Sequence, residues 1–403
     1  MKPRAVLLRL SAMYFVQNLV WAAQLVLLSG HMDSLGFSGE QISYVFGTGA
    51  LAAIVSPLIA GWVADRFFPG EIIAGISYLL CAPLLYFCWQ QTEFGPLWWG
   101  MFFFSVIHAP TMALTNAVAF RHLEDLGKFG RIRVWGSIGW VGMTWCLSAY
   151  LRFWENWTPG VSHLGDGLLI AALFAALMGL YCFTLPHTPP SREGRNPYAF
   201  LEAFRLFRQR NFAVLLGSAF VIAATSPLVW NFSFIFLIDA ENGPGMAPSA
   251  ANWVLSLGQV MEIPVMLTLG FLLRRLGMRL TLFLGMIAQV VRAGALAVGE
   301  PVWMVVAAQT ANGFFITFFF IASAMAVEQL ARDDIRASAQ GLLTFTSWGL
   351  GSLLGQFMAG RVYDYFTLAD GSHVWGAIFA VPAITALVVA VVFVLLFRGE
   401  EDR

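Results

Sequence analysis

The chain has 403 residues, of which 59% are hydrophobic and only 11% are charged, whereas about 25% of an ordinary soluble domain is charged. Its 23 lysines and arginines balance its 23 aspartates and glutamates, so no basic excess exists to bind nucleic acid. Its lysines, Lys2 and Lys128, lie outside any glycine-rich phosphate-binding string, which excludes an ATP-driven pump within this chain. The composition indicates a protein of the lipid bilayer.

Apolar runs of about 20 residues, long enough to cross a bilayer as helices, recur along the whole length. They predict an all-α integral membrane protein with twelve transmembrane helices, at about 7–30, 41–64, 71–90, 96–120, 130–152, 165–186, 212–238, 250–273, 279–298, 301–327, 339–363 and 372–397. The first run carries Gln17 and Asn18 and has no small-residue cleavage site, so we expect a retained helix rather than a signal peptide.

Basic residues gather in alternate connections, which predicts the orientation because lysine and arginine are retained on the cytoplasmic side. With the amino terminus inside, almost all of them, such as Lys128 and Arg195, fall in cytoplasmic connections. The outer connections carry acids instead, for example Glu93 and Asp239. We therefore expect both termini in the cytoplasm and a multi-pass protein of the bacterial inner membrane.

The longest polar stretch, 187–211, divides the chain into an amino-terminal half, 1–186, and a carboxy-terminal half, 212–403, of six spans each. The string Gly61-Trp62-Val63-Ala64-Asp65-Arg66 after the second span recurs in outline at 270–275, after the eighth. Ile132-Arg133 is likewise echoed by Ile335-Arg336. Two parallel six-helix repeats with a midplane site are typical of the major facilitator fold, which this pattern resembles. We expect conformational roles for Gly61, Asp65, Arg66 and Arg336; the alternative is an ordinary positively charged turn.

Glu262 is the best candidate for a proton carrier. It lies in the middle of the eighth span, on one stripe with Gln259 and Ser256. An ionisable group within hydrocarbon costs about 2.5–3.5 kcal/mol, so one that is retained usually serves transport. The alternative is a structural carboxylate held by an arginine or by helix-end donors.

Polar side chains on other spans predict a substrate site. Arg133, Ser137 and Trp140 share one face of the fifth span, where they can hydrogen-bond and stack; alternatively Arg133 snorkels and Trp140 packs against lipid. Further candidates are Gln17 and Trp21 in the first span, Asn116 in the fourth, Gln309, Asn312 and Thr317 in the tenth, and Gln340 and Thr344 in the eleventh. Singly, each is as consistent with interhelical hydrogen bonding.

The remaining chemistry-bearing residues indicate no enzyme. The six histidines lack metal-ligand spacing, so we expect no metal and no cofactor, with the proton as coupling ion. Ser162 beside His163 has no nucleophile context. Arg292, in the ninth span, is expected to be structural and to snorkel to the outer interface.

Several strings of residues point to a particular family more specifically than the features above. Ile132-Arg133-Val134-Trp135-Gly136-Ser137-Ile138-Gly139 and Ile335-Arg336-Ala337-Ser338-Ala339-Gln340-Gly341, with Gln259 and Glu262, resemble the bacterial nucleoside:proton symporters of the major facilitator superfamily nearly end to end. The resemblance implies that Arg133, Ser137, Trp140, Gln259 and Glu262 form the nucleoside site and its proton-linked acid. We expect a monomer that imports nucleosides by alternating access.

Two departures from the family leave the substrate open. Thr317 stands where the family has an acid, and apolar or rigid residues around Pro227 and Trp230 replace polar ones. The carboxy-terminal half of the site is therefore less polar and more aromatic. Alternatives are another neutral solute, such as a sugar or an amphipathic drug, a facilitator without proton coupling, or a non-transporting sensor with a transporter fold.

Overall fold

The computed structural model describes residues 3–64, 69–123, 129–188, 204–332 and 335–398, and that part is helical apart from turns, connections and one isolated bridge, Thr367–His373. The amino-terminal helices are α1 (Pro3–Leu25), α2 (Leu28–Ser34), α3 (Gly39–Ala64), α4 (Gly70–Trp89), α5 (Phe94–His122), α6 (Phe129–Trp157) and α7 (Asp166–Cys182). After them come η2 (Phe204–Arg208), α9 (Arg210–Ile238), α10 (Pro248–Val298), α11 (Val302–Ala308), α12 (Ala311–Phe315), η3 (Ile316–Ile321), α13 (Ala322–Leu330), α14 (Arg336–Thr344), η4 (Phe345–Gly351), α15 (Ser352–Tyr365) and α16 (Trp375–Leu396).

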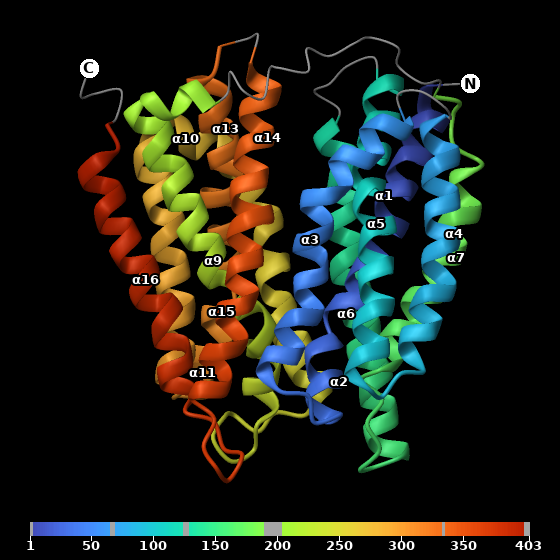
Figure 1. Cartoon of the computed structure of the whole chain (residues 1–403), viewed down its shortest axis with the longest axis vertical. Coiled ribbons are helices and arrows are strands. Elements are labelled where there is room, and N and C mark those ends of the chain that lie inside the picture. The colour runs from blue at the N-terminus through green and yellow to red at the C-terminus, as the bar shows by residue number, and fades with distance from the viewer. Residues whose placement is uncertain (1–2, 65–68, 124–128, 189–203, 333–334, 399–403) are drawn as a thin grey trace. The chain divides into compact units, whose positions relative to one another are not determined.

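The chain forms two compact units (Figure 1). Unit 1 comprises Met1–Phe37, Tyr44–Glu193 and Ala247–Trp253. Unit 2 comprises Ser38–Ser43, Gly194–Met246 and Val254–Arg403. Each unit has its own buried core, so each is described by itself.

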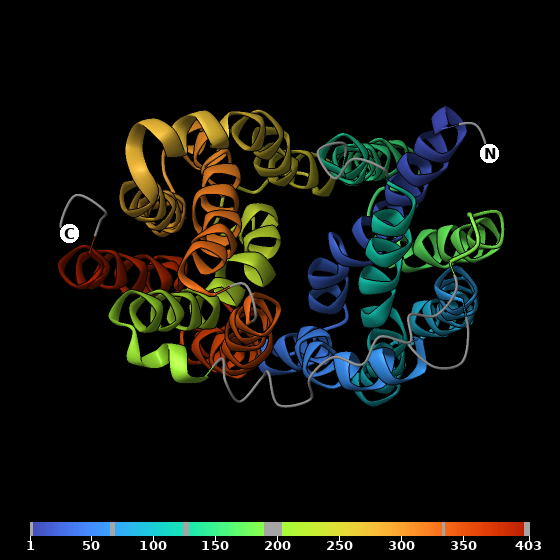
Figure 2. The same ribbon diagram turned by 90° about the horizontal axis from the view of Figure 1, so that it is seen from above.

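In unit 1, α1 packs against α6 and α7, and α4 packs against α5 and α7 (Figures 1 and 2). Small residues permit a close crossing of α1 and α6. A Cβ added at Gly139 would lie 2.5 Å from the carbonyl oxygen of Phe15, and one at Gly136 would lie 2.6 Å from Nδ2 of Asn18. Glycines at such positions let helix backbones approach each other in membranes.

In unit 2, α9 is the central helix and packs against α15, α16 and η4. Helix α10 is long because two helices join at Gly277, whose φ of 73° lies in the left-handed region that glycine adopts without strain. The junction separates the expected eighth and ninth spans. Two more expected spans, the tenth and the eleventh, contain π-helical turns, η3 and η4. Such turns inside longer helices are frequent at functional sites.

Seven helical segments of the described residues are long and apolar enough to cross a membrane. They are Ala5–Ser34, Gly70–Trp89, Phe94–His122, Arg210–Ile238, Pro248–Val298, Val302–Leu330 and Trp375–Leu396. The protein is therefore a multi-pass membrane protein.

Candidate substrate and proton site

The predicted face of α6 meets α1 within unit 1. The indole rings of Trp140 and Trp21 are edge to face, with centroids 5.3 Å apart. Arg133 is exposed, and Ser137 and Trp140 on the same face are half-buried. Trp21 is 38% exposed, although it lies in an apolar helix. The rest of the chain thus covers the aromatic pair and Arg133 only in part.

Hydrogen bonds from α1 to α5 complete this surface. The Tyr14 hydroxyl donates to Oδ1 of Asn116 over 2.6 Å. Gln17 is buried and donates Nε2 to the sulfur of Met112, while its Oε1 has no hydrogen-bond partner among the described residues. The structure therefore brings together the predicted residues of α1, α5 and α6. Met112 carried no signal in the sequence because a lone methionine in an apolar span indicates only packing.

The proton-carrier candidate lies on α10 of unit 2, where Gln259 and Glu262 are half-buried. Two glycines hold this helix tightly against α12. A Cβ at Gly313 would lie 2.5 Å from the backbone nitrogen of Glu262, and one at Gly258 would lie 2.8 Å from Cβ of Asn312. The backbone of Glu262 is therefore held in place, while the residue as a whole is half-buried.

Thr317, which stands in place of the family's acid, is fully buried in η3. Its hydroxyl has no hydrogen-bond partner among the described residues. A hydroxyl buried in this way contacts a ligand only when η3 moves. Because π-helical turns leave the regular helical hydrogen-bond ladder, η3 is a suitable place for such a movement.

Arg292 corrects one expectation from the sequence. Its side chain does not snorkel to the interface: the residue is only 5% exposed. Its Nε donates to Oε1 of Gln309 over 3.2 Å, and its Nη1 donates to Oδ1 of Asn312 over 2.6 Å. Both amides are also buried, so a charged cluster stands at the contact of α10 and α12 that holds Glu262.

The structure describes some of the residues with expected conformational roles. Arg336, at the start of α14, lies 3.5 Å from the carboxylate of Glu328 on α13, measured from Nε to Oε1. Gly61 belongs to α3, whereas Asp65 and Arg66 lie outside the described residues. The ion pair joins the two helices on either side of a connection that was predicted to be cytoplasmic.

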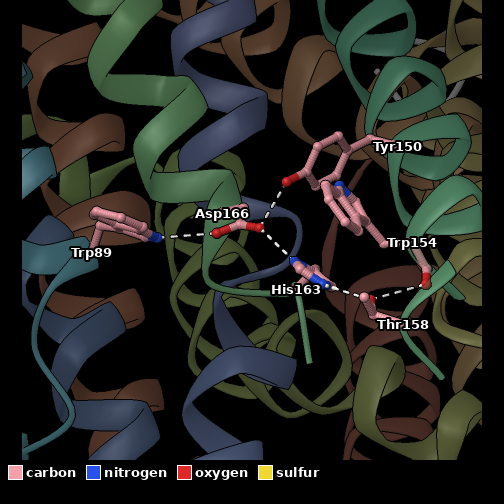
Figure 3. A network of polar contacts seen from close by, with 6 residues as sticks. All are labelled: Trp89, Tyr150, Trp154, Thr158, His163 and Asp166. Atoms are coloured by element: carbon pink, nitrogen blue, oxygen red, sulfur yellow. Dashed lines mark hydrogen bonds and ion pairs between the residues drawn. The ribbon is translucent and has the colours of Figure 1, made fainter. Parts of the chain in front are cut away.

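A second polar network lies at the connection of α6 and α7 (Figure 3). One carboxylate oxygen of Asp166 accepts from Nε1 of Trp89 over 3.1 Å. The other accepts from the Tyr150 hydroxyl over 2.7 Å and bonds to Nδ1 of His163 over 2.9 Å. The His163 ring stacks on Trp154, with centroids 4.6 Å apart. Asp166 thus joins α4, α6 and α7, apart from the predicted site residues.

Comparison with known proteins identifies the family to which the chain belongs. The sequence profile described as "Nucleoside H+ symporter" matches residues 4–402. The chain belongs to the nucleoside:H+ symporter family.

Individual relatives agree with this assignment. The chain is 30% identical to the xanthosine permease of Escherichia coli, over 99% of this chain and 97% of that protein. It is 27% identical to the nucleoside permease NupG of E. coli, over 98% of this chain and 97% of NupG. The crystal structure of NupG covers 99% of this chain, and all of NupG is matched, with a TM-score of 0.86 and 26% identity.

These findings make the chain a transporter rather than an enzyme, and the nucleoside:proton symporter predicted from its sequence. Its fold is that of the major facilitator transporters. Nucleosides and protons are therefore its substrate and its coupling ion.

Proposed function

We propose that the nucleoside binds to the face formed by α1, α5 and α6, and that Glu262 carries the coupled proton. The observation that supports the first part is the Trp21–Trp140 pair, which lies two helical turns along α6 from the exposed Arg133. A base stacks on an indole with a gain of about 1–3 kcal/mol. The Arg133 guanidinium and the Ser137 hydroxyl then donate to base carbonyls or to ribose hydroxyls.

Gln17, Asn116, Gln259 and Thr317 complete the proposed substrate set. Gln17 contributes a buried carbonyl oxygen that has no donor within the part of the chain that the structure describes. A buried acceptor without a donor costs about 1–3 kcal/mol, so a ligand hydroxyl or amine that donates to it gains that amount. Asn116 holds Tyr14 in place. Gln259 lies on α10 three residues before Glu262, and Thr317 becomes available only with a movement of η3.

Glu262 suits a proton carrier because its helix backbone is held and the residue is half-buried. A protonated carboxyl group crosses the apolar phase at far lower cost than a carboxylate. Loading at the outer side and release at the inner side would then couple the proton gradient to nucleoside uptake by alternating access. Since Thr317 is not ionisable, Glu262 carries the coupling alone.

We also propose the setting of this transporter. It is a monomer in the lipid bilayer of a bacterial inner membrane, with twelve spans and both termini cytoplasmic. The halves are 1–186 and 212–403, with the linker 187–211. The charge asymmetry of the connections and the positions of the apolar runs support this arrangement.

Uptake by vesicles of purified protein tests both parts. With an inward proton gradient, wild-type protein is expected to accumulate radiolabelled nucleosides above equilibrium. Glu262→Gln is expected to exchange nucleosides but not to accumulate them, and Arg133→Gln to raise KM by about 10-fold, equivalent to about 1.4 kcal/mol. The exposed Arg152→Gln serves as a control. Gradient-driven accumulation by Glu262→Gln would refute the coupling role.

The alternative solutes are separated by ligand-induced thermal stabilisation. Nucleosides, sugars and amphipathic drugs are added to the purified protein at equal concentration. A ligand at about 100 times its Kd stabilises the folded state by about 2.7 kcal/mol. Stabilisation by sugars or drugs with none by nucleosides would refute the proposed site.

A further inference from the structure

Arginines from two other helices of unit 2 bind the carboxy-terminal end of α16. Nη2 of Arg279, on α10, donates to the carbonyl oxygen of Val394 over 2.6 Å. Nη2 of Arg210, at the start of α9, donates to the carbonyl oxygen of Leu395 over 3.4 Å. The last carbonyl groups of a helix have no partner within it and carry partial negative charge, so cations are favoured there.

A third arginine stands at the same end of α16. Asn211 donates Nδ2 to the backbone oxygen of Arg398 over 2.9 Å, and its Oδ1 accepts from the backbone nitrogen of Arg398 over 3.0 Å. We call Arg210, Arg279 and Arg398 the basic cluster. Arg210 and Arg398 are exposed, and no carboxylate of the described residues forms an ion pair with either. These two positive charges therefore have no counter-charge within the described part of the chain.

An exposed apolar stripe of α16 ends at the basic cluster. It consists of Ile384, Val388, Val391 and Leu395, whose exposed fractions lie between 50% and 72%. Their spacing of four, three and four residues places them on one face of the helix. Helix α16 has a mean hydropathy of 2.9, the highest of the seven described segments that could cross a membrane, so this face suits lipid chains. Arg210 binds the carbonyl oxygen of the last residue of the stripe.

Cations at the end of an apolar stripe match the two parts of a phospholipid. Guanidinium groups bind phosphate oxygens through paired N–H donors, and Arg210 uses one of its five N–H donors for Leu395. Acyl chains of the same molecule gain by covering apolar surface. A soluble phosphate would leave the stripe uncovered, and a zwitterionic headgroup would add a cation beside the arginines. An anionic phospholipid satisfies both the charges and the stripe.

We propose that the basic cluster binds the headgroup of an anionic phospholipid, whose acyl chains lie along the exposed stripe of α16. The bound lipid joins the ends of α9, α10 and α16 and so stabilises unit 2. The site uses none of the residues of the proposed nucleoside and proton sites, so it does not rest on the proposed function.

Lipid binding to the purified full-length protein in detergent tests this inference. The probes are phosphatidylglycerol and phosphatidylcholine with the same acyl chains, and the readouts are lipid-bound protein in native mass spectrometry and Tm. The wild type is expected to bind phosphatidylglycerol more tightly and to gain more Tm from it. Arg210→Gln is expected to weaken phosphatidylglycerol binding about 5-fold, which corresponds to the roughly 1 kcal/mol that a basic residue contributes at a membrane surface. Binding of phosphatidylcholine should not change.

The matched control is Arg131→Gln, which removes an exposed arginine near the start of α6 in unit 1. It should bind phosphatidylglycerol as the wild type does. Arg279→Lys keeps the charge and should retain most of the binding, whereas Arg279→Gln should lose about as much as Arg210→Gln. If Arg279→Gln does not fold because the end of α16 is released, Arg210→Gln and Arg398→Gln decide the question.

Three results would overturn the inference. The first is equal binding of the two lipids by the wild type, or equal losses in Arg131→Gln and Arg210→Gln. The second is stabilisation by inorganic phosphate as large as that by phosphatidylglycerol, because the acyl chains would then contribute nothing. The third concerns Glu400, Glu401 and Asp402, which follow the cluster in the sequence. Lipid selectivity that appears only after these acids are replaced by amides would show that they, rather than a lipid, neutralise the arginines.

Discussion

The guanidinium of Arg292 lies 2.6 Å from Oδ1 of Asn312, and both residues are buried in unit 2. A charge in such a place is expensive unless hydrogen bonds satisfy it. Here the two donors, Nε and Nη1, reach two different amides, Gln309 and Asn312. Since Gly258, one turn before Glu262, packs on Asn312, this cluster also fixes the contact that positions Glu262, the proposed proton carrier.

Arg292→Lys is expected to destabilise the protein because one ammonium group cannot reproduce the fork of two donors at fixed positions. Loss of one charged hydrogen bond is expected to lower the free energy of unfolding by about 1.5–3 kcal/mol, which is measured as a lower Tm in detergent. Arg152→Lys, at an exposed position of α6, should change stability by no more than about 0.5 kcal/mol. Equal Tm values for Arg292→Lys and the wild type would show that the second hydrogen bond contributes nothing.

Gly139→Ala is expected to disrupt the crossing of α1 and α6, because the added Cβ would lie 2.5 Å from the Phe15 carbonyl oxygen. Separation of these helices should lower both Tm and nucleoside uptake. Gly142→Ala, three residues further along α6, meets nothing within 4 Å. It should raise stability by up to about 1 kcal/mol through helix propensity. If the two variants behave alike in uptake assays, the close approach is not needed for transport.

Asp166→Asn is expected to lower Tm. The carboxylate uses one oxygen to accept from Trp89 and the other to bind Tyr150 and His163, whereas an amide has only one oxygen. At least one partly buried group loses its partner, at a cost of about 1–3 kcal/mol. Tyr150→Phe removes one hydrogen bond and leaves Asp166 its other two partners, so its Tm should lie between those of Asp166→Asn and the wild type. The opposite order of the two variants would mean that the hydroxyl, not the carboxylate, holds the network together.

His373 predicts a dependence of stability on pH. Burial lowers its pKa from the usual 6.5, against the opposing charges of Asp239 and Asp364. Because the pKa is lower in the folded than in the unfolded state, the unfolded chain takes up the proton first. Stability is therefore full above about pH 6.5 and falls as the pH drops through the folded-state pKa.

His373→Gln should flatten this profile between about pH 8 and pH 5, measured as Tm against pH. Asp239 does not interfere in this window. Burial disfavours its charge, but hydrogen bonds from Trp375 and from the backbone N–H groups of Asn242 and Glu241 hold its pKa below 3.8. A variant profile parallel to that of the wild type would show that another group causes the decline.

The helical periodicity of the sequence was sufficient to predict which residues of α6 share one face. Arg133, Ser137 and Trp140 share that face because residues three, four and seven apart on a helix always do. Gln17 and Asn116 were identified as polar residues in apolar spans, and the structure adds their partners, Met112 and Tyr14. The family assignment was likewise available from local strings of residues.

Features that depend on contacts between distant parts of the chain could not be predicted from local sequence patterns. Arg292 was expected to snorkel, because its amide partners lie in another helix and nothing local indicates them. Thr317 was a candidate for direct binding, yet the packing of unit 2 buries it in a π-helical turn.

The sequence by itself determined that this is a multi-pass helical transporter of the nucleoside:proton symporter family, because hydropathy, charge asymmetry and helical periodicity are local properties. Only the tertiary structure decided that Trp230 and Trp348, from α9 and η4, stack in parallel, and that Glu262 is held by a glycine of another helix. The physical reason is that van der Waals and hydrogen-bond contacts act over a few ångströms, so they exist only after the chain has brought distant residues together.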